Sequence, residues 1–222
     1  MRWSNVVMVH WRCDAAQLSE RLPAGLELER FCDHVYVSLV ALQAVGPLPH
    51  PLLVSTFAPL FRYHQVSLRT YVVGGAGPGM WMLDTRVDRP FAIAARAVGM
   101  PYHFDRRLAL HLHDGAIVLR SSLADLEGHW SADAEPAEPE AGGLTDFLLG
   151  RRRTYATLPG GALYTLDLCH APCLVRPVHL SRAPSAQVFE LGPALPVSSQ
   201  LSEPIDVRFA ALHKIAYAAH PR

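Results

Sequence analysis

The sequence predicts a mainly β fold of the α+β class, with a mostly antiparallel sheet curled into a barrel and a few short flanking helices. Alternating or β-branched apolar runs, separated by turn residues, recur along the 222 residues. Helical patterns are few and rarely alternate with strands as βαβ units would. Because 50 % of the residues are hydrophobic and no repeat is visible, residues 1–222 are expected to form a single domain.

The N-terminal half is expected to hold a capped helix followed by two hairpins. Asp14 is a typical helix N-cap, and the helix should end at Leu22, before Pro23. The expected strands are Leu26–Phe31, Val35–Leu42, His64–Val73 and Met80–Thr85. The first two should pair across Cys32–His34, and the other two across the glycine-rich turn Gly74–Gly79.

A second helix is expected after Asp88, which is a suitable N-cap, and Gly99 should end it. The residues expected on its apolar face are Phe91, Ala94, Ala95 and Val98. Asp114–Gly115 predicts a type I′ hairpin between Arg107–His113 and Ala116–Ser122.

The C-terminal part predicts short strands and helices. The expected strands are Arg151–Ala156, Ala162–Leu168, Leu174–Leu180 and Ile205–Leu212, and the expected helices are Thr145–Leu149, capped by Thr145, and Ala186–Glu190. Two long loops are also expected. Pro47–Pro59 is apolar and proline-rich, and should fold over a pocket or a subunit contact. Ala132–Gly143 is acidic and should be solvated or disordered.

Composition excludes several classes of partner. The net charge is +0, so the electrostatic attraction that drives non-specific binding to nucleic acid or anionic lipid is absent. The apolar run Val6–Val9 is too short for a signal peptide or a membrane span, and four scattered cysteines predict reduced thiols. We therefore expect a cytoplasmic protein that binds neither nucleic acid nor membrane, with homo-oligomerisation left open.

No metal or cofactor is expected. Cys169, His170 and Cys173 lie close together, but a structural zinc site needs a second ligand pair at comparable spacing, and none is visible. His111 and His113 share one face of their strand, so a site formed by these two side chains and a carboxylate is geometrically possible, but the sequence identifies no such carboxylate. Nucleotide fingerprints, nucleophile elbows and zinc-protease motifs are absent.

Alternation along Val66–Val72 places Ser67, Arg69 and Tyr71 on one face of a strand. If that face lines a barrel interior, Arg69 needs either a carboxylate partner or an anionic ligand, because an unpaired buried charge is costly. A structural salt bridge and an anion site both satisfy this requirement.

Five segments together resemble one bacterial family. They are HWRCDAAQL (His10–Leu18), LPAGLEL (Leu22–Leu28), LRTYV (Leu68–Val72), VGMPYHFDRR (Val98–Arg107) and GGALYTLDLCHAP (Gly160–Pro172). The chain resembles the YqjF-like family, domain of unknown function 2071, within the acetoacetate decarboxylase-like superfamily. The resemblance implies a cone-shaped β-barrel. It also places Gln65 and Ser67 where relatives commonly carry an acidic residue and an asparagine, and this departure argues against a shared acid–base role for the strand. Gln65 and Ser67 are candidate ligand-binding residues together with Arg69 and Tyr71.

The resemblance also identifies Tyr102 and His103 as candidate catalytic residues. After the proline that precedes this pair, the decarboxylases carry two lysines, one of which forms a Schiff base, whereas the only lysine here is Lys214. A phenol and an imidazole are suited to acid–base chemistry or to hydrogen bonding, although they can equally be amphipathic residues at a strand start.

Two classes of function remain. The first is a protein with a barrel pocket for a small organic molecule and no Schiff-base decarboxylase activity. The second is an enzyme of the same superfamily that acts on a small carbonyl or carboxylate compound by acid–base chemistry.

Overall fold

The structure, a computed structural model, describes residues 1–46, 61–131, 133–158, 160–184, 186–192 and 194–215. The strands are β1 (Arg2–Cys13), β2 (Leu26–Leu28), β3 (Val35–Val45), β4 (Arg62–Gly74), β5 (Gly77–Val87), β6 (Tyr102–Phe104), β7 (Ala109–His113), β8 (Ala116–Arg120), β9 (Leu126–His129), β10 (Arg153–Thr157), β11 (Leu163–Cys169), β12 (Val175–Pro177), β13 (His179–Arg182), β14 (Pro196–Ser202), β15 (Ile205–Asp206) and β16 (Arg208–Lys214). The helices are α1 (Ala15–Ser19), η3 (Pro90–Val98), α3 (Leu144–Leu149) and η4 (Ala186–Phe189).

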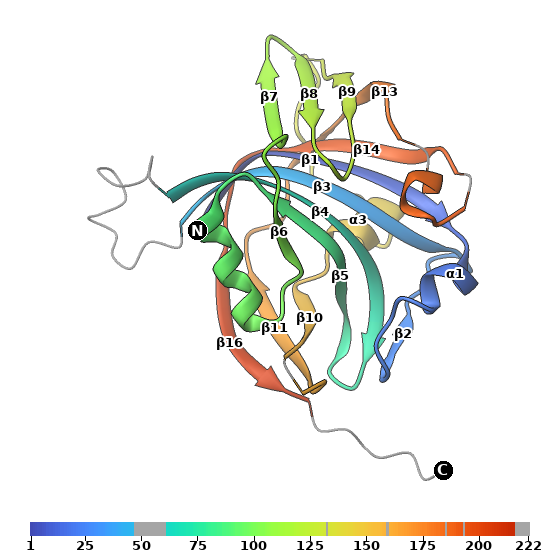
Figure 1. Ribbon diagram of the computed structural model, residues 1–222. Helices are drawn as coiled ribbons and strands as arrows, with labels where there is room; N and C mark the ends of the chain where they lie inside the picture. Colours follow the sequence, from blue (N-terminus) through green and yellow to red (C-terminus); the bar gives the residue numbers. More distant parts are fainter. Residues whose placement is uncertain (47–60, 132, 159, 185, 193, 216–222) are drawn as a thin grey trace.

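Most strands form one bent sheet. Its order is β12-β14-β1-β3-β4-β5-β10-β11-β16, with β15 on β1, β2 on β4 and β6 on β5. The pairs β5–β10 and β5–β6 are parallel, and the other pairs in this sheet are antiparallel. Figure 1 shows the strong bend of the long strands, with the smaller sheet β13-β9-β8-β7 standing at one end.

The mainly β class with few short helices is confirmed, but the main sheet does not close into the predicted barrel among the described residues. Within the described residues the end strands β12 and β16 do not pair with each other. The reason is visible in the chain path. After three residues in β12 the chain leaves the main sheet and enters the small one as β13.

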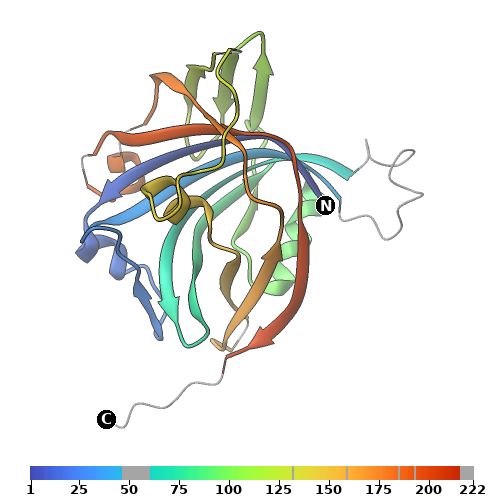
Figure 2. The same cartoon turned by 180° about the vertical axis from the view of Figure 1, so that it is seen from behind.

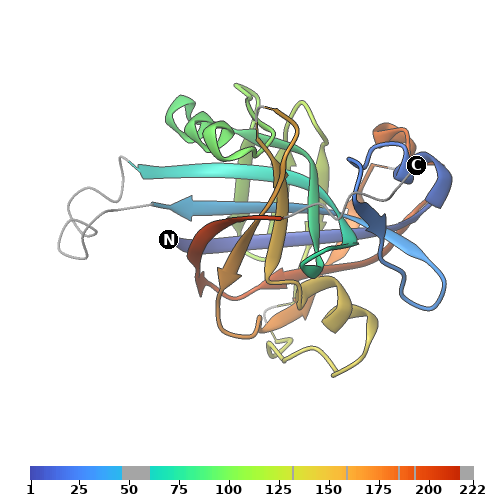
Figure 3. The same ribbon diagram turned by 90° about the horizontal axis from the view of Figure 1, so that it is seen from below.

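The main sheet is buried on both faces. On β1, Val7, Val9 and Trp11 belong to a core that also contains residues of the small sheet and the helices α1 and η4. The alternate residues Val6 and Met8 belong to a second core on the concave face, together with residues of α3 and η3. Figures 2 and 3 show that α3 and η3 lie well apart from each other along the bent main sheet.

Several turns match the sequence prediction. β4 and β5 pair from Gln65↔Val87 to Gly74↔Gly77, and β7 and β8 pair around Asp114 and Gly115, both with positive φ. Asp14 caps α1 by accepting from the Ala16 amide at 2.7 Å.

Other local predictions were wrong. β2 pairs with β4, so Cys32–His34 forms only a tight turn with one bridge between Phe31 and His34. The helix after Asp88 is a 3₁₀ helix that begins after Arg89. Its period of about three residues per turn buries Ala92 and exposes the predicted apolar face at Phe91 and Val98.

Two predicted caps are also used differently. Asp88 does not cap its helix, because its carboxylate binds the backbone and ring nitrogens of His64 at 2.8 and 2.9 Å. Gly143, rather than Thr145, is the N-cap position of α3.

The strands β1, β9 and β14 were not predicted, and two predicted strands are each divided in the structure. Leu174–Leu180 becomes β12 and β13, and Ile205–Leu212 becomes β15 and β16. The predicted loop Pro47–Pro59 lies outside the described residues. Most of the acidic loop is described, and Ala137 pairs with Val175 through hydrogen bonds of 3.0 and 2.9 Å, so that part of it is held against the sheet.

Candidate functional site

The concave face of the main sheet carries the polar residues predicted for β4. Gln65, Ser67 and Tyr71 are 6 %, 2 % and 0 % exposed, and Arg69 is half-buried. Their alternate neighbours Val66 and Leu68 lie in the core on the opposite face. The structure therefore brings Gln65, Ser67, Arg69 and Tyr71 to one face of one strand.

Arg69 is a cation without a compensating carboxylate in the part of the chain that is described. It makes no ion pair there, and its Nε is buried without a hydrogen-bond acceptor. Buried polar atoms are nearly always paired, so an orphaned guanidinium nitrogen marks a place where water or a ligand binds.

Arg69 lines a small, largely enclosed cavity of about 50 Å³. Most of its walls are apolar, from Trp3, Val6, Met8, Val40, Met80, Met82, Leu149, Leu168 and Ile205, and the polar lining adds Arg151, Thr154, His170 and Cys173. This space holds a few waters or a small organic group. The sequence did not single out Arg151 or Thr154, because they come from a strand and a loop far from Arg69 in the chain.

Arg151 is already compensated. Its Nε and Nη2 contact the two carboxylate oxygens of Glu29 at 2.9 and 2.5 Å, and its guanidinium lies 4.5 Å from the centre of the Phe147 ring. This bidentate pair uses up the nearby carboxylate. Of the two arginines that line the cavity, Arg69 is therefore the one whose positive charge is not compensated by a carboxylate among the described residues.

A buried hydrogen-bond chain runs beside Arg69. Gln200 Oε1 lies 2.8 Å from His10 Nε2, His10 Nδ1 lies 2.6 Å from Ser38 Oγ, and Ser38 Oγ lies 2.6 Å from Tyr71 Oη. Tyr71 Oη also donates to the carbonyl oxygen of Leu148 at 2.8 Å. β1, β3, β4, β14 and α3 thus each contribute one member.

Burial and the Arg69 charge control the titration of this chain. Burial, followed by the positive charge of Arg69, lowers the pKa of His10 to about 3, although the hydrogen bond to Gln200 opposes both effects. Burial raises the pKa of Tyr71, while Arg69 and Ser38 oppose that rise. Both side chains are neutral near pH 7.

Tyr102 lies farther along the same concave face. Its hydroxyl donates to Gln65 Oε1 at 2.8 Å, and burial, assisted by the neighbouring Tyr63, raises its pKa. Gln65 and Arg69 are four residues apart on β4, or about 13 Å at the usual rise of a strand. Tyr102 is not among the residues that line the Arg69 cavity.

His103 does not join this group. It follows Tyr102 in β6, and strand alternation turns its ring to the opposite side. No hydrogen bond of that ring occurs within the described residues.

Between Gln65 and Arg69 on β4, Ser67 pairs across the strands with Thr85 of β5. The buried hydroxyl of Thr85 also lacks a hydrogen-bond partner within the described residues.

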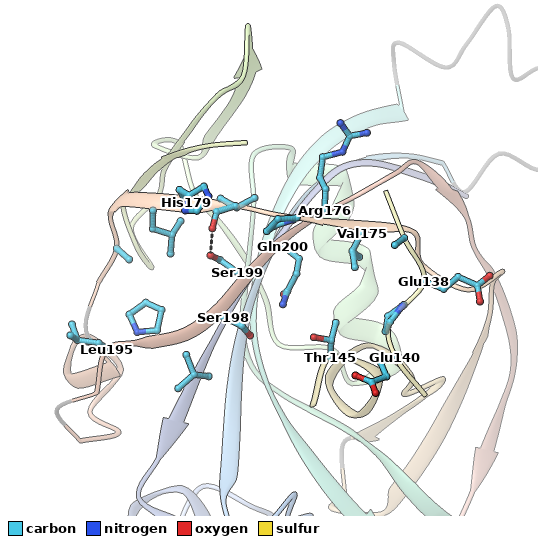
Figure 4. Close-up of a pocket in the computed structure, with 18 residues that line it drawn as sticks. Glu138, Glu140, Thr145, Val175, Arg176, His179, Leu195, Ser198, Ser199 and Gln200 are labelled. Carbon is cyan, nitrogen blue, oxygen red and sulfur yellow. Dashed lines mark hydrogen bonds between the residues drawn. The ribbon is translucent and has the colours of Figure 1, made fainter. Parts of the chain in front are cut away.

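A larger and more open groove, of about 790 Å³, lies at the edge of β14 (Figure 4). β12, β14, the 137–140 segment and α3 line it, and Ser199 donates to the carbonyl oxygen of Val178 at 2.7 Å. Its arginine, Arg176, is paired with Glu203. Although larger, the groove lacks an uncompensated cation, so we place the candidate site at Arg69. Gln200 lines this groove and also contacts His10, so it joins the groove to the buried hydrogen-bond chain beside Arg69.

The described residues contain no cluster of three or more His, Cys, Asp or Glu side chains that could hold a metal ion. Cys169 is exposed and Cys173 is half-buried in the Arg69 cavity wall. Burial raises the pKa of the Cys173 thiol, and the nearby Arg69 opposes the rise.

Comparison with solved structures defines the class of fold as acetoacetate decarboxylase-like. The enduracididine biosynthesis enzyme MppR with HEPES bound superposes with a TM-score of 0.69 at 16 % identity, over 97 % of this chain and 86 % of that chain. MppR complexed with pyruvate superposes with a TM-score of 0.67 at 16 % identity, over 96 % of this chain and 88 % of that chain. Acetoacetate decarboxylase from Legionella pneumophila superposes with a TM-score of 0.61 at 14 % identity, over 97 % of this chain and 86 % of that chain.

Residues 1–206 match the family DUF2071, described as an uncharacterized conserved protein, and the chain belongs to this family. It is 25 % identical over 221 residues to the uncharacterized protein YqjF of Bacillus subtilis (strain 168), covering 96 % of this chain and 90 % of that one. Among the described residues, no helix has the length and apolar character needed to cross a membrane.

The buried, neutral His10 predicts a specific sensitivity to acid. In the unfolded state His10 binds a proton near pH 6.5, whereas in the folded state it does so only at about pH 3. Between these values the unfolded state binds more protons, so the free energy of unfolding decreases as the pH is lowered. Between pH 7 and 5, the wild-type free energy of unfolding in urea should fall by about 1–2 kcal/mol more than that of His10→Asn. Equal losses in both proteins would contradict this. A histidine NMR titration of the wild type gives a second test, because the His10 ring should remain neutral at pH 5.

Proposed function

We propose that this protein binds a small organic carboxylate in the Arg69 cavity and does so without Schiff-base chemistry. The observation that carries the proposal is the Arg69 Nε, which is buried without an acceptor among the described residues and belongs to a guanidinium without a carboxylate partner. The alternative function of Arg69 anticipated from the sequence, a structural salt bridge, receives no support from the described contacts.

The energetics favour an anion at this position. A guanidinium shielded from water by apolar walls is costly unless an opposite charge compensates it. A carboxylate supplies both the charge and acceptors matched to the guanidinium, and charge-assisted hydrogen bonds are stronger than neutral ones. The aliphatic walls, such as Val6, Met8 and Leu168, suit a short hydrocarbon portion.

The structural relatives are consistent with a small molecule as ligand. MppR has been solved with HEPES and with pyruvate bound. At 16 % identity this likeness extends only to the fold, so the choice of a carboxylate rests on Arg69.

The absence of Schiff-base chemistry is proposed from the position of the lysine. Lys214 is the only lysine of the chain, and it is exposed on β16, opposite Tyr164 of β11. The neutral phenol of Tyr102 lies where the resemblance to the decarboxylases places a lysine.

An acid–base enzyme remains the second candidate function, and one contact favours it. The Tyr102 hydroxyl is held by Gln65 on the face that also carries Arg69. With its pKa raised by burial, Tyr102 would not serve as a base, and to act as a hydrogen-bond donor it would give its single proton to a ligand carbonyl in place of Gln65. Such a ligand would have to span the roughly 13 Å between Gln65 and Arg69.

Replacing Arg69 should abolish selectivity for carboxylates. Arg69→Met should weaken pyruvate binding by about 1.5–3 kcal/mol, the range of a hydrogen bond to a charged group. Isothermal titration calorimetry would measure this loss. Arg62→Met removes an exposed arginine from the same strand and is the matched control. Pyruvate affinity that is unchanged by Arg69→Met would disprove the anion site.

Borohydride trapping tests the proposed lack of Schiff-base chemistry. After reduction in the presence of acetoacetate or pyruvate, the intact mass should be unchanged, because no lysine lies in the Arg69 cavity lining. A stoichiometric adduct on Lys214 would show that the C-terminal strand delivers an amine to a bound carbonyl compound.

A further inference from the structure

The direction of the buried hydrogen-bond chain is fixed at its Leu148 end. The Leu148 carbonyl oxygen can only accept, so Tyr71 donates to it at 2.8 Å. Because the Tyr71 hydroxyl has one proton, its 2.6 Å contact with Ser38 must be filled by the Ser38 proton. Ser38 in turn must accept from His10 Nδ1, at 2.6 Å. The Tyr71 oxygen is then left to accept from Ser38 and from Arg69.

This direction determines which end of the Gln200 amide faces His10. The neutral imidazole has its single proton on Nδ1, so its Nε2 is an acceptor and needs a donor across the 2.8 Å contact. The two ends of a glutamine amide have nearly the same shape, and the hydrogen-bond network decides between them. With the NH₂ group toward His10, every contact of the chain contains one proton, whereas with the oxygen there two acceptors would face each other. Gln200 therefore donates to His10 and keeps its Oε1 for another partner.

The second end of this amide is accessible from the groove at the edge of β14. Gln200 is only 8 % exposed, and it lines the groove. Its second amide heteroatom makes no hydrogen bond among the described residues, yet it is not one of the fully enclosed atoms that lack a partner there. Figure 4 shows the Gln200 side chain extending from β14 into the groove. A deeply buried side chain thus presents an unused carbonyl oxygen to this space.

The opposite wall of the groove adds acceptors and negative charge. It is formed by α3 and the 137–140 segment, and it contributes Thr145, Glu138 and Glu140 (Figure 4). Neither glutamate forms an ion pair within the described part of the chain. Arg176, the arginine of the lining, is paired with Glu203. The groove therefore has an excess of acceptors and of negative charge, which complements a cation that carries N–H donors.

The rest of the lining is largely apolar and suits a short hydrocarbon chain. Pro177 and Val178 lie in it, and it ends at Leu195 and Val197, which are 79 % and 43 % exposed. The volume of about 790 Å³ is within the range of about 300–1,000 Å³ that is usual for small-molecule sites. The apolar and acceptor regions together match a molecule with an alkyl part and a charged amine.

We propose that this groove is a second ligand site, which binds a small primary alkylammonium ion. Its N–H groups donate to Gln200 Oε1 and to the Glu140 carboxylate, and its alkyl chain lies along Leu195 and Val197. The buried chain acts here as a positioning device, because it holds the Gln200 amide with its oxygen toward the groove.

The second site is separate from the Arg69 cavity. Ser198 of the groove pairs across the strands with His10, His10 with Ser38, and Ser38 with Arg69. Three strand spacings, about 14 Å in all, therefore lie between Ser198 and Arg69. His10 and Ser38 are fully buried between them, so the amine site does not depend on an anion at Arg69.

Titration of the full chain with n-butylammonium chloride tests the site. It is carried out at pH 8, where alkylammonium groups are charged and imidazoles in general are not. NMR spectra should show saturable shifts at Gln200 and Val197. n-Butanol, which lacks the charge, and tetramethylammonium, which lacks N–H donors, should bind about tenfold more weakly, since a hydrogen bond to a charged group is lost. No binding of n-butylammonium, or equal binding of tetramethylammonium, would overturn the proposal.

Two variants locate the ammonium group. Glu140→Gln should weaken n-butylammonium binding about two- to fivefold, the range of an exposed ion pair. Glu135→Gln removes an exposed acid of the same segment outside the groove lining and should leave the affinity unchanged. Gln200→Met should weaken binding about tenfold. Unchanged affinity in both Glu140→Gln and Gln200→Met would contradict the assigned contacts.

The His10 ring gives a measurement that does not depend on the folding of Gln200→Met. The ¹⁵N resonances of wild-type His10 should be those of the tautomer protonated at Nδ1. The tautomer protonated at Nε2 would mean that Gln200 turns its NH₂ group to the groove, and this result would overturn the amine site.

Discussion

The bent main sheet is buried on both faces, and this requires each long strand to divide its side chains between two cores. β1, β3 and β4 send alternate residues to the core shared with the small sheet and to the concave core under α3. An apolar residue satisfies this requirement anywhere, but a polar residue on the concave face must find a partner there. The partners of the concave polar residues therefore determine what the interior can bind.

Most of those partners are provided within the protein. His10, Ser38, Tyr71 and Gln200 satisfy one another, and Tyr102 is satisfied by Gln65. Arg69 Nε and Thr85 Oγ1 are the concave-face atoms of β4 and β5 that remain buried without a partner in the described part of the chain. Of these two positions, Arg69 is the better candidate for binding a ligand, because its charge is also uncompensated. Its cavity has the size and the apolar walls suited to a small organic anion.

Local signals in the sequence predicted much of the fold. The glycine turn between β4 and β5 and the Asp114–Gly115 turn were predictable because a positive φ restricts the residue type. Alternation on β4 correctly grouped Ser67, Arg69 and Tyr71 on one face. Two other features depend on residues that are distant in the sequence, and no local sequence pattern indicates them. They are the pairing of β2 with β4 and the hydrogen bond between Asp88 and His64.

The same limitation explains why the buried chain was not predicted. His10 lies 28 residues from Ser38 and 190 from Gln200, and β1 and β14 were both missed as strands. Val6, Met8 and His10 do alternate, but the adjacent Val7 and Val9 are apolar too, as expected for a strand buried on both faces. A histidine in such a strand was the available signal that this position needs buried polar partners.

A crystal structure with pyruvate tests the central claim most directly. The account predicts carboxylate density within hydrogen-bonding distance of Arg69 Nε, between the guanidinium and the apolar wall formed by Val6 and Met8. Density confined to the open groove beside β14, or an Arg69 guanidinium that turns to pair with a protein carboxylate, would contradict it.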